Sequence, residues 1–289
     1  SVTCDSHGAC IGGGKSEDFG EIVFNSSGTV TAVANDDISI AIGGGIAKES
    51  LIKMVQGRTV IRTTGEKTIG MGFISGNGEI SLVKGVLNIE SSGAEAVGLG
   101  TFKGDIRLST CADVSAVCSG DTCACIGGFA DSKGTIEINE GHIFTKANAK
   151  NAVGIGGIGS EINTVVHSGS VTVRAEGVII CGIGDRSVRG SVSIESGKLE
   201  LNILSGNCVT LGAPAEKTVV FGGNITGNTV EDIKAVNTFG EPLTMHKFDS
   251  VGEFIREVRS GGGTYRYVAE SGGNNEVNVF LPDNYEFIG

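Results

Sequence analysis

The sequence predicts an all-β protein: a right-handed parallel β-helix (β-solenoid) of about eight coils, followed by a small C-terminal α+β cap. Three observations predict this class. Two independent markers repeat with a period of about 28 residues, each period holds short stretches of alternating apolar and polar residues, and no period holds a helical pattern. A period of this length is typical of solenoids and propellers, and the content of one period decides between them.

The first marker is an apolar residue that is followed each time by glycine. Its eight members are Ile11, Ile42, Met71, Leu99, Ile126, Ile155, Ile183 and Leu211. The second marker is a glycine, replaced once by aspartate, that keeps nearly the same period. Its members are Gly28, Gly57, Gly85, Asp113, Gly141, Gly169, Gly197 and Gly223. Because both markers keep one period over most of the chain, we expect eight stacked coils over residues 1–228.

The stretch of residues 134–147, GTIEINEGHIFTKA, covers half of one period and shows two strands of a coil. Ile136 and Ile138 alternate with polar residues in its first half, and Ile143 and Thr145 do so in its second half. Such alternation is typical of strands with one buried face. The stretch AVGIG adds a third strand, and three short strands describe a β-helix coil, since a propeller blade needs four. Parallel crossovers are nearly always right-handed, so we expect a right-handed coil.

Inward-pointing side chains of equivalent strands should stack into columns. The first predicted column is Val30, Thr59, Leu87, Ser115, Ile143, Val171 and Leu199. The second is Ala32, Ile61, Ile89, Val117, Thr145, Val173 and Leu201. The glycines are expected at corners, where the chain turns sharply and often takes a positive φ.

The stretch AVGIGGIG contains Gly154, Gly156 and Gly159 at the spacing of a dinucleotide-binding fingerprint, and Glu176 stands near the place of its acid. That fingerprint must open a helix. The sequence that follows, SEINTVVHSGSVTVRAEG, instead has the alternation of strands. We therefore expect no nucleotide or other cofactor and a structural role for these glycines.

Composition and charge exclude several classes of partner. The net charge of −11 argues against nucleic acid and anionic membranes, which both need a basic face. No apolar run approaches the length of a membrane span, so no membrane insertion is expected. The first residue is Ser1 rather than Met, and we expect a processed or trimmed start.

The repeat resembles a known class. GIGG followed by GTIEINEGHIFTKA is similar to the glycine-rich GIGGG-type repeats of secreted and wall-attached bacterial cell-surface proteins, over about residues 5–228. The resemblance implies a β-solenoid in an adhesin, a stalk or a glycan-facing module, secreted or displayed at the cell surface. It brings no catalytic signature. The cysteines and the irregular first and fourth coils depart from the family's pattern.

The period stops near residue 228, and residues 229–289 are expected to form an α+β capping or appended module. FDSVGEFIREVRSG predicts an amphipathic helix that begins with a capping box at Ser250 and Glu253. TYRYVAE and EVNVFLP predict two strands. A solenoid must cover its last open edge, which gives this module its expected role.

The eight cysteines predict disulfides, because an even count is typical of an oxidising compartment. The candidate pairs are Cys4–Cys10, Cys118–Cys125, Cys111–Cys123 and Cys181–Cys208. The first two flank short segments at equivalent places of the first and fifth repeats. Two alternatives stay open: free thiols packed in columns, and a metal site at the four cysteines between residues 111 and 125. Their C-x-C spacing does not match the usual zinc pattern, so we expect no metal.

One corner offers candidates for catalysis. GIGDRSVRG brings together Asp185, Arg186 and Arg189, and β-helices often carry polysaccharide lyases and hydrolases, which need clustered carboxylates or a base. No second carboxylate stands nearby in the sequence, and a solvated turn with one salt bridge explains the cluster more simply. A polysaccharide-active enzyme is therefore the alternative function, and the sequence favours a protein that is not an enzyme.

Binding candidates are aromatic residues that can stack on sugars. The repeats contain neither Trp nor Tyr, and Phe144 is expected to point outward from the rod. Tyr265 and Tyr267 share one face of a strand in the terminal module, where a core role competes with a sugar platform. The sequence thus predicts a surface-displayed structural or adhesive rod whose partner is an extracellular glycan or protein. A further alternative is a fibre subunit that self-associates end to end.

Overall fold

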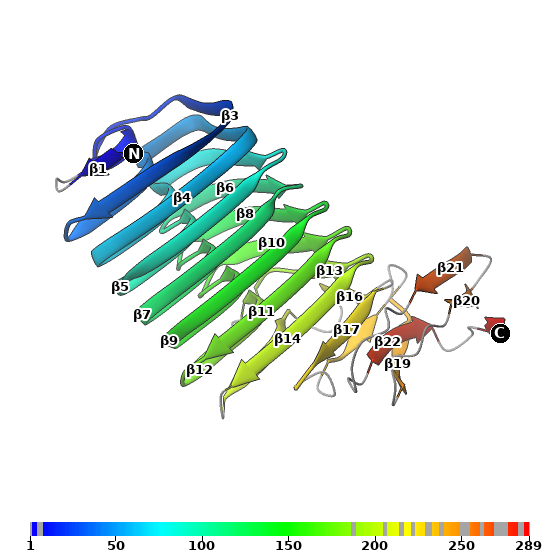
Figure 1. The fold of residues 1–289 in the computed structure, drawn as a ribbon. Coiled ribbons are helices and arrows are strands. Elements are labelled where there is room, and N and C mark those ends of the chain that lie inside the picture. The colour runs from blue at the N-terminus through cyan, green and yellow to red at the C-terminus, as the bar shows by residue number, and fades with distance from the viewer. Residues whose placement is uncertain are drawn as a thin grey trace.

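The computed structural model is all-β, and the parallel solenoid expected from the sequence is confirmed (Figure 1). The structure describes residues 2–4, 8–185, 189–204, 207–213, 217–220, 223–228, 233–236, 240–248, 255–260, 263–268, 277–282 and 286–288. Within these ranges there is no helix, and so none that could cross a membrane. Parallel ladders join the coils along the whole rod.

Each coil has three faces. The first face contains β1 (Val2–Cys4), β11 (Ser170–Glu176), β14 (Lys198–Leu204) and β17 (Asn224–Gly227). The second contains β2 (Gly8–Gly12), β12 (Ile179–Asp185) and β15 (Cys208–Gly212). The third contains β6 (Gly104–Thr110), β8 (Ser132–Ile138), β10 (Glu161–Val166), β13 (Val192–Ile194), β16 (Thr218–Val220) and β18 (Ala235–Val236).

Longer strands bend round a corner and contribute to more than one face. Those that run from the first to the second face are β5 (Val86–Thr101), β7 (Asp113–Gly128) and β9 (His142–Gly157). β3 (Glu21–Asn35) links the third face to the first, and β4 (Ile38–Leu82) winds through more than one whole coil. The three short strands per period that the sequence predicts are therefore present, although a corner often leaves them continuous.

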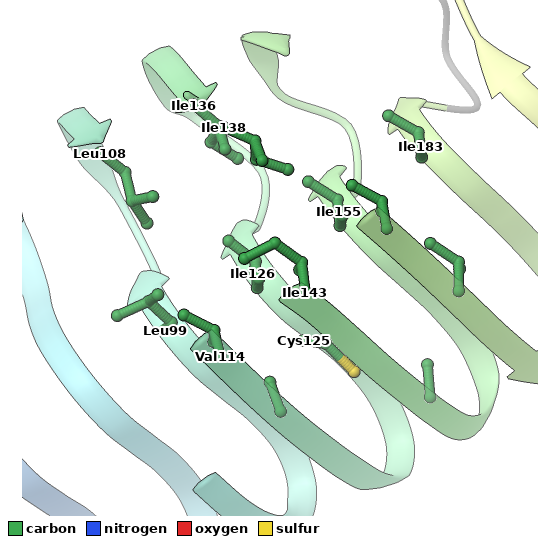
Figure 2. Packing of buried hydrophobic residues seen from close by; sticks show 14 of the residues in the cluster. Leu99, Leu108, Val114, Cys125, Ile126, Ile136, Ile138, Ile143, Ile155 and Ile183 are labelled. Carbon is green, nitrogen blue, oxygen red and sulfur yellow. The ribbon is translucent and has the colours of Figure 1, made fainter. Parts of the chain in front are cut away.

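The first marker forms a column on the second face. Its registers pair Ile11 with Ile42, and join Met71, Leu99, Ile126, Ile155, Ile183 and Leu211 one after another. Figure 2 shows Leu99, Ile126, Ile155 and Ile183 in successive coils, facing Leu108 and Ile136 of the third face. Columns of this kind fill the interior and exclude water from it along the rod.

The glycine after each marker is explained by contact between coils. Gly127 and Gly156 have φ of 133° and 126°, a region that favours glycine. A Cβ on Gly127 would lie 1.6 Å from the carbonyl oxygen of Gly156, and one on Gly156 would lie 2.2 Å from that of Gly184. The stretch AVGIGGIG is therefore a corner at which neighbouring backbones touch.

The two predicted core columns are right except in the coil that contains Ile126. There Leu87 pairs with Val114, not Ser115, and Ile89 pairs with Ala116, not Val117. Val114 and Ala116 are buried, whereas Ser115 and Val117 are half-buried on the outer side. The cause is a corner that is one residue shorter, since Leu82 pairs with Thr110 but Val86 pairs with Asp113.

The prediction of a helix over FDSVGEFIREVRSG is wrong for the residues that the structure describes. Residues 255–260 of that segment form β20 (Ile255–Ser260), which pairs with β21 (Gly263–Val268) and β23 (Glu286–Ile288) in an antiparallel sheet. The capping-box residues lie outside the described residues. Hydrogen bonding to two partner strands has outweighed a helical pattern that local propensity favours only weakly.

Antiparallel strands close the C-terminal edge of the solenoid. β22 (Val277–Pro282) pairs with β17, and β19 (Pro242–Phe248) pairs with both β22 and β18. Phe280 of β22 is 1% exposed and joins the solenoid core. These strands satisfy backbone groups that an open parallel edge would leave unpaired.

Candidate functional site

The carboxylate of Asp185, the first catalytic candidate, hydrogen-bonds to backbone amides of the fold. Asp185 ends β12 and its side chain is 1% exposed. Its Oδ1 accepts a hydrogen bond from the amide of Gly159 at 3.1 Å, and its Oδ2 accepts one from the amide of Ser160 at 2.9 Å. The carboxylate thus holds the corner of the preceding coil. Arg189 is exposed, and Arg186 lies outside the described residues.

A pocket of about 300 Å³ lies beside Asp185, between two successive coils. Much of its lining is apolar and includes Val153, Ile158, Ile179 and Cys181. Asp185 is the one carboxylate among its described lining residues. Glycoside hydrolysis normally uses two carboxylates that flank the scissile bond. The described part of this corner therefore supplies only one of the groups that such a reaction needs.

Four of the cysteines occupy equivalent positions of their coils, as the comparison of repeats in the sequence suggests. Cys4 pairs in register with Ala34, and the same column continues through Thr63 and Ser91 to Cys118. Cys10 and Cys125 each stand directly before the marker residue of their coil. All eight cysteines belong to the described residues, and all eight are thiols in this structure.

Three thiols form a buried cluster where the first and second faces meet. Cys118, Cys123 and Cys125 are at most 1% exposed. A hydrogen bond with the Cys125 side chain, followed by burial, raises the pKa of Cys118 well above its usual range. Burial, reinforced by the neighbouring Cys125, raises the pKa of Cys123. Such thiols stay protonated and unreactive at neutral pH.

In two candidate pairs, Cys111–Cys123 and Cys181–Cys208, the two cysteines differ in burial or in register. Cys111 is exposed while Cys123 is fully buried. Cys181 pairs in register with Val209, and Cys208 pairs with Ile180, so the two cysteines are offset by one position. Successive positions of a strand point to opposite faces. No group of three or more His, Cys, Asp or Glu in the described ranges is arranged to hold a metal ion.

Phe144 lies on the outer side of the first face, as expected from the alternation. It is half-buried between the fully buried Ile143 and Thr145. Its register partners in the adjacent coils are Ser115 and Thr172. The guanidinium carbon of Arg174 stands 5.6 Å from the centre of the ring, within the range of a cation–π interaction.

The two tyrosine candidates lie on β21, two positions apart. Tyr265 pairs in register with Val258 and Tyr267 with Arg256.

Sequence reasoning missed a second pair of aromatic rings. Phe102 and Phe129 lie at successive corners with ring centroids 5.2 Å apart, and they pack on the outside of Ile40, Ile69 and Val97. The signal was an apolar residue three positions after the first marker in four successive coils: Ile74, Phe102, Phe129 and Ile158. These side chains cover part of the second face from outside.

Charged side chains on the outer surface are arranged in ladders of opposite sign. Arg62 binds Glu90 at 3.0 Å, Lys67 binds Glu95 at 2.8 Å and Lys133 binds Glu161 at 3.5 Å. The residues of each pair stand directly opposite in adjacent coils. Opposite charges at such positions support the ladder, whereas like charges destabilise it.

Comparison of the chain with protein-family models, with curated proteins and with solved structures finds no match.

Proposed function

We propose that this protein is an extracellular or surface-displayed rod that binds a polysaccharide along its first face. The observation that carries the proposal is the position of Phe144. Its partly exposed ring stands on a layer of strands, and its neighbours in register are the hydroxyl residues Ser115 and Thr172. An aromatic ring can stack on the apolar side of a sugar, while hydroxyl side chains donate hydrogen bonds to and accept them from sugar hydroxyls.

The regular stack supports the same proposal. Equivalent positions of successive coils are separated by the strand spacing of about 4.8 Å, so the face offers a repeating set of side chains to a repeating ligand. The interior columns make the rod stiff, which suits a module that displays a binding face away from its attachment point. The resemblance of the repeats to bacterial cell-surface proteins points to the same class of function.

The test is retention of the purified protein on a panel of insoluble plant and host polysaccharides, with released sugars assayed in parallel. The wild-type protein should be retained without releasing fragments. Phe144→Ala should lower retention at least about fivefold, in line with the energy of one aromatic contact. Val60→Ala is the matched control, because Val60 belongs to the same outer column and lies three coils away.

Two results would overturn the proposal. Release of oligosaccharides would make the protein an enzyme. Equal retention of the Phe144→Ala and Val60→Ala variants would remove the first face from the binding site.

A further inference from the structure

One pair of charged residues breaks the rule of opposite-sign ladders. Lys146 and Arg174 stand directly opposite each other on β9 and β11, on the outer side of the first face. Every other pair of charged residues that the ladders between described strands place in register combines a cation with an anion. Two facing cations destabilise such a ladder.

Neither cation is neutralised by a neighbour. Lys146 and Arg174 are exposed, and neither forms an ion pair with any residue that the structure describes. The carboxylates closest in the register are those of Glu176, on the same strand as Arg174, and Glu200, one coil further on. The Glu200 carboxylate instead accepts a hydrogen bond from the Asn202 side chain at 2.7 Å.

Lys146 and Arg174 both lie next to the ring of Phe144. Arg174 stands over the ring of Phe144, and Lys146 lies two positions along the same strand as Phe144, on the same side. The next position of the Lys146 and Arg174 column is Asn202. A ring, two cations and an amide thus form one continuous outer patch, which we call the cationic patch: Phe144, Lys146, Arg174 and Asn202.

The positive charge of this patch contrasts with the negative net charge of the whole protein. The chain carries a net charge of −11, so an unpaired cation on its surface has many carboxylates available as partners elsewhere. An arrangement that places two cations together and leaves both without an anion favours an anion supplied from outside. Arg binds carboxylate and sulfate through two parallel hydrogen bonds, and Lys adds a compact point charge.

We infer that the cationic patch binds an acidic polysaccharide, one whose sugars carry carboxylate or sulfate groups. The inference rests on the proposed function and names its ligand class. Phe144 contacts the apolar side of one sugar, and Lys146 and Arg174 bind the acidic group of the same or the next sugar. Asn202 hydrogen-bonds to ring hydroxyls. The strongly acidic remainder of the surface repels polyanions that lack a sugar to stack on the ring.

The experiment measures binding of the full chain to soluble polygalacturonate, which carries carboxylates, and to heparin, which carries sulfates. Neutral dextran, polyglutamate and single-stranded DNA are the comparison ligands. The double variant Lys146→Gln/Arg174→Gln keeps the side-chain stems and removes both charges. Arg62→Gln is the matched control, because it removes a cation from the same outer column but leaves the cationic patch intact.

The expected result is binding to one or both acidic polysaccharides that weakens steeply with added salt. The double variant should lose at least about tenfold in affinity, the size expected for hydrogen bonds to a charged group. Arg62→Gln should stay within about twofold of wild type. The thermal midpoint of the double variant should equal or exceed that of wild type, since the repulsion between the two cations is removed. Carboxylate and sulfate ligands are distinguished by which of the two probes binds.

Contrary results separate the two claims. If the protein is retained on neutral polysaccharides and ignores both acidic ones, the inference fails and the proposed function stands. If acidic polysaccharides bind equally to wild type and the double variant, the cationic patch is not their site. If polyglutamate or DNA binds as tightly as the polysaccharides, the ligand class is wrong. If no polysaccharide binds at all, the proposed function fails together with the inference.

Discussion

At the scale of single residues, glycines in this fold differ in what they do, although they look alike in the sequence. Gly156 has φ of 126° and leaves no room for a Cβ, because the carbonyl of Gly184 lies against it. Gly159 has φ of 71°, but the nearest atom to its Cβ position is 3.8 Å away. The first is required by contact between coils, and the second only by the backbone conformation.

This difference predicts unequal effects of alanine. Gly156→Ala places a methyl group 2.2 Å from the backbone oxygen of Gly184 and should lower the free energy of unfolding by about 4 kcal/mol or more. Gly159→Ala brings only the strain of the left-handed conformation, about 1–2 kcal/mol. Chemical denaturation of the two variants measures both values. Similar losses in both would show that coil contact does not select the glycine.

The buried thiols predict how stability depends on pH. In the folded protein the pKa values of Cys118 and Cys123 are raised, so the folded state keeps protons that unfolded cysteines release above about pH 8.5. The stability from these groups is full below that pH and is lost as the pH rises further. Each proton contributes a slope of up to about 1.4 kcal/mol per pH unit.

The measurement is the free energy of unfolding at several pH values between about 7 and 10.5 under reducing conditions. Cys118→Ala/Cys123→Ala should flatten the decline above pH 8.5, because it removes the two linked protons. Cys111→Ala removes an exposed thiol and should leave the wild-type slope unchanged. A double variant that loses stability as steeply as wild type would contradict this explanation.

At the scale of elements, one corner sets the register of a whole coil. The corner before Asp113 is one residue shorter than its equivalents, and this moves Val114 rather than Ser115 into the core column. Val114→Ala should therefore destabilise the protein by roughly 1–3 kcal/mol through a lost core contact. Ser115→Ala should change stability by less than about 0.5 kcal/mol. Thermal or denaturant unfolding of both variants checks the register. A larger loss of stability in Ser115→Ala than in Val114→Ala would contradict the observed register and favour the one expected from the sequence.

The same corner shows how far the sequence predicts this molecule. The period, the alternating residues and the glycines were enough to predict the solenoid and most of the core columns, because each coil repeats the contacts of its neighbours. Asp113 stands at the interval of the second marker, but the ladder places it opposite Val86, one position after Gly85, so the assignment of Asp113 to the glycine marker is wrong and the missing residue shows only in the register. Segment 255–260 has a helical period, but its strand partners come from residues up to 288, and a local pattern cannot reveal them.

The sequence also predicts the candidate sites only in part. The outward position of Phe144 was predictable, since alternation alone decides it. The burial of Asp185 was not, because the amides that bind it belong to Gly159 and Ser160 in the preceding coil. The facing cations Lys146 and Arg174 are 28 positions apart, and only the exact register of β9 and β11 brings them into line.

At the scale of the whole molecule, each coil is held by the coils on its two sides. In such an array, stability is the sum of the coils and of the contacts between neighbours, and the ends open more easily than the middle. Hydrogen exchange should therefore be slowest for the strands of the middle coils, β5, β7 and β9, and faster for β1 and β2. Mass spectrometry of peptides from each coil measures this gradient.

A substitution in one coil tests whether neighbouring coils are coupled in stability. Gly156→Ala acts at the contact between the coils of Ile155 and Ile183, so exchange should rise most in β9 and β12. It should rise least in β3, which lies several coils away, because coupling passes only from neighbour to neighbour. Gly159→Ala serves as the control for strain without coil contact. An equal rise in every strand would mean that the rod opens as one cooperative unit, and the neighbour-by-neighbour description of its stability would then be wrong.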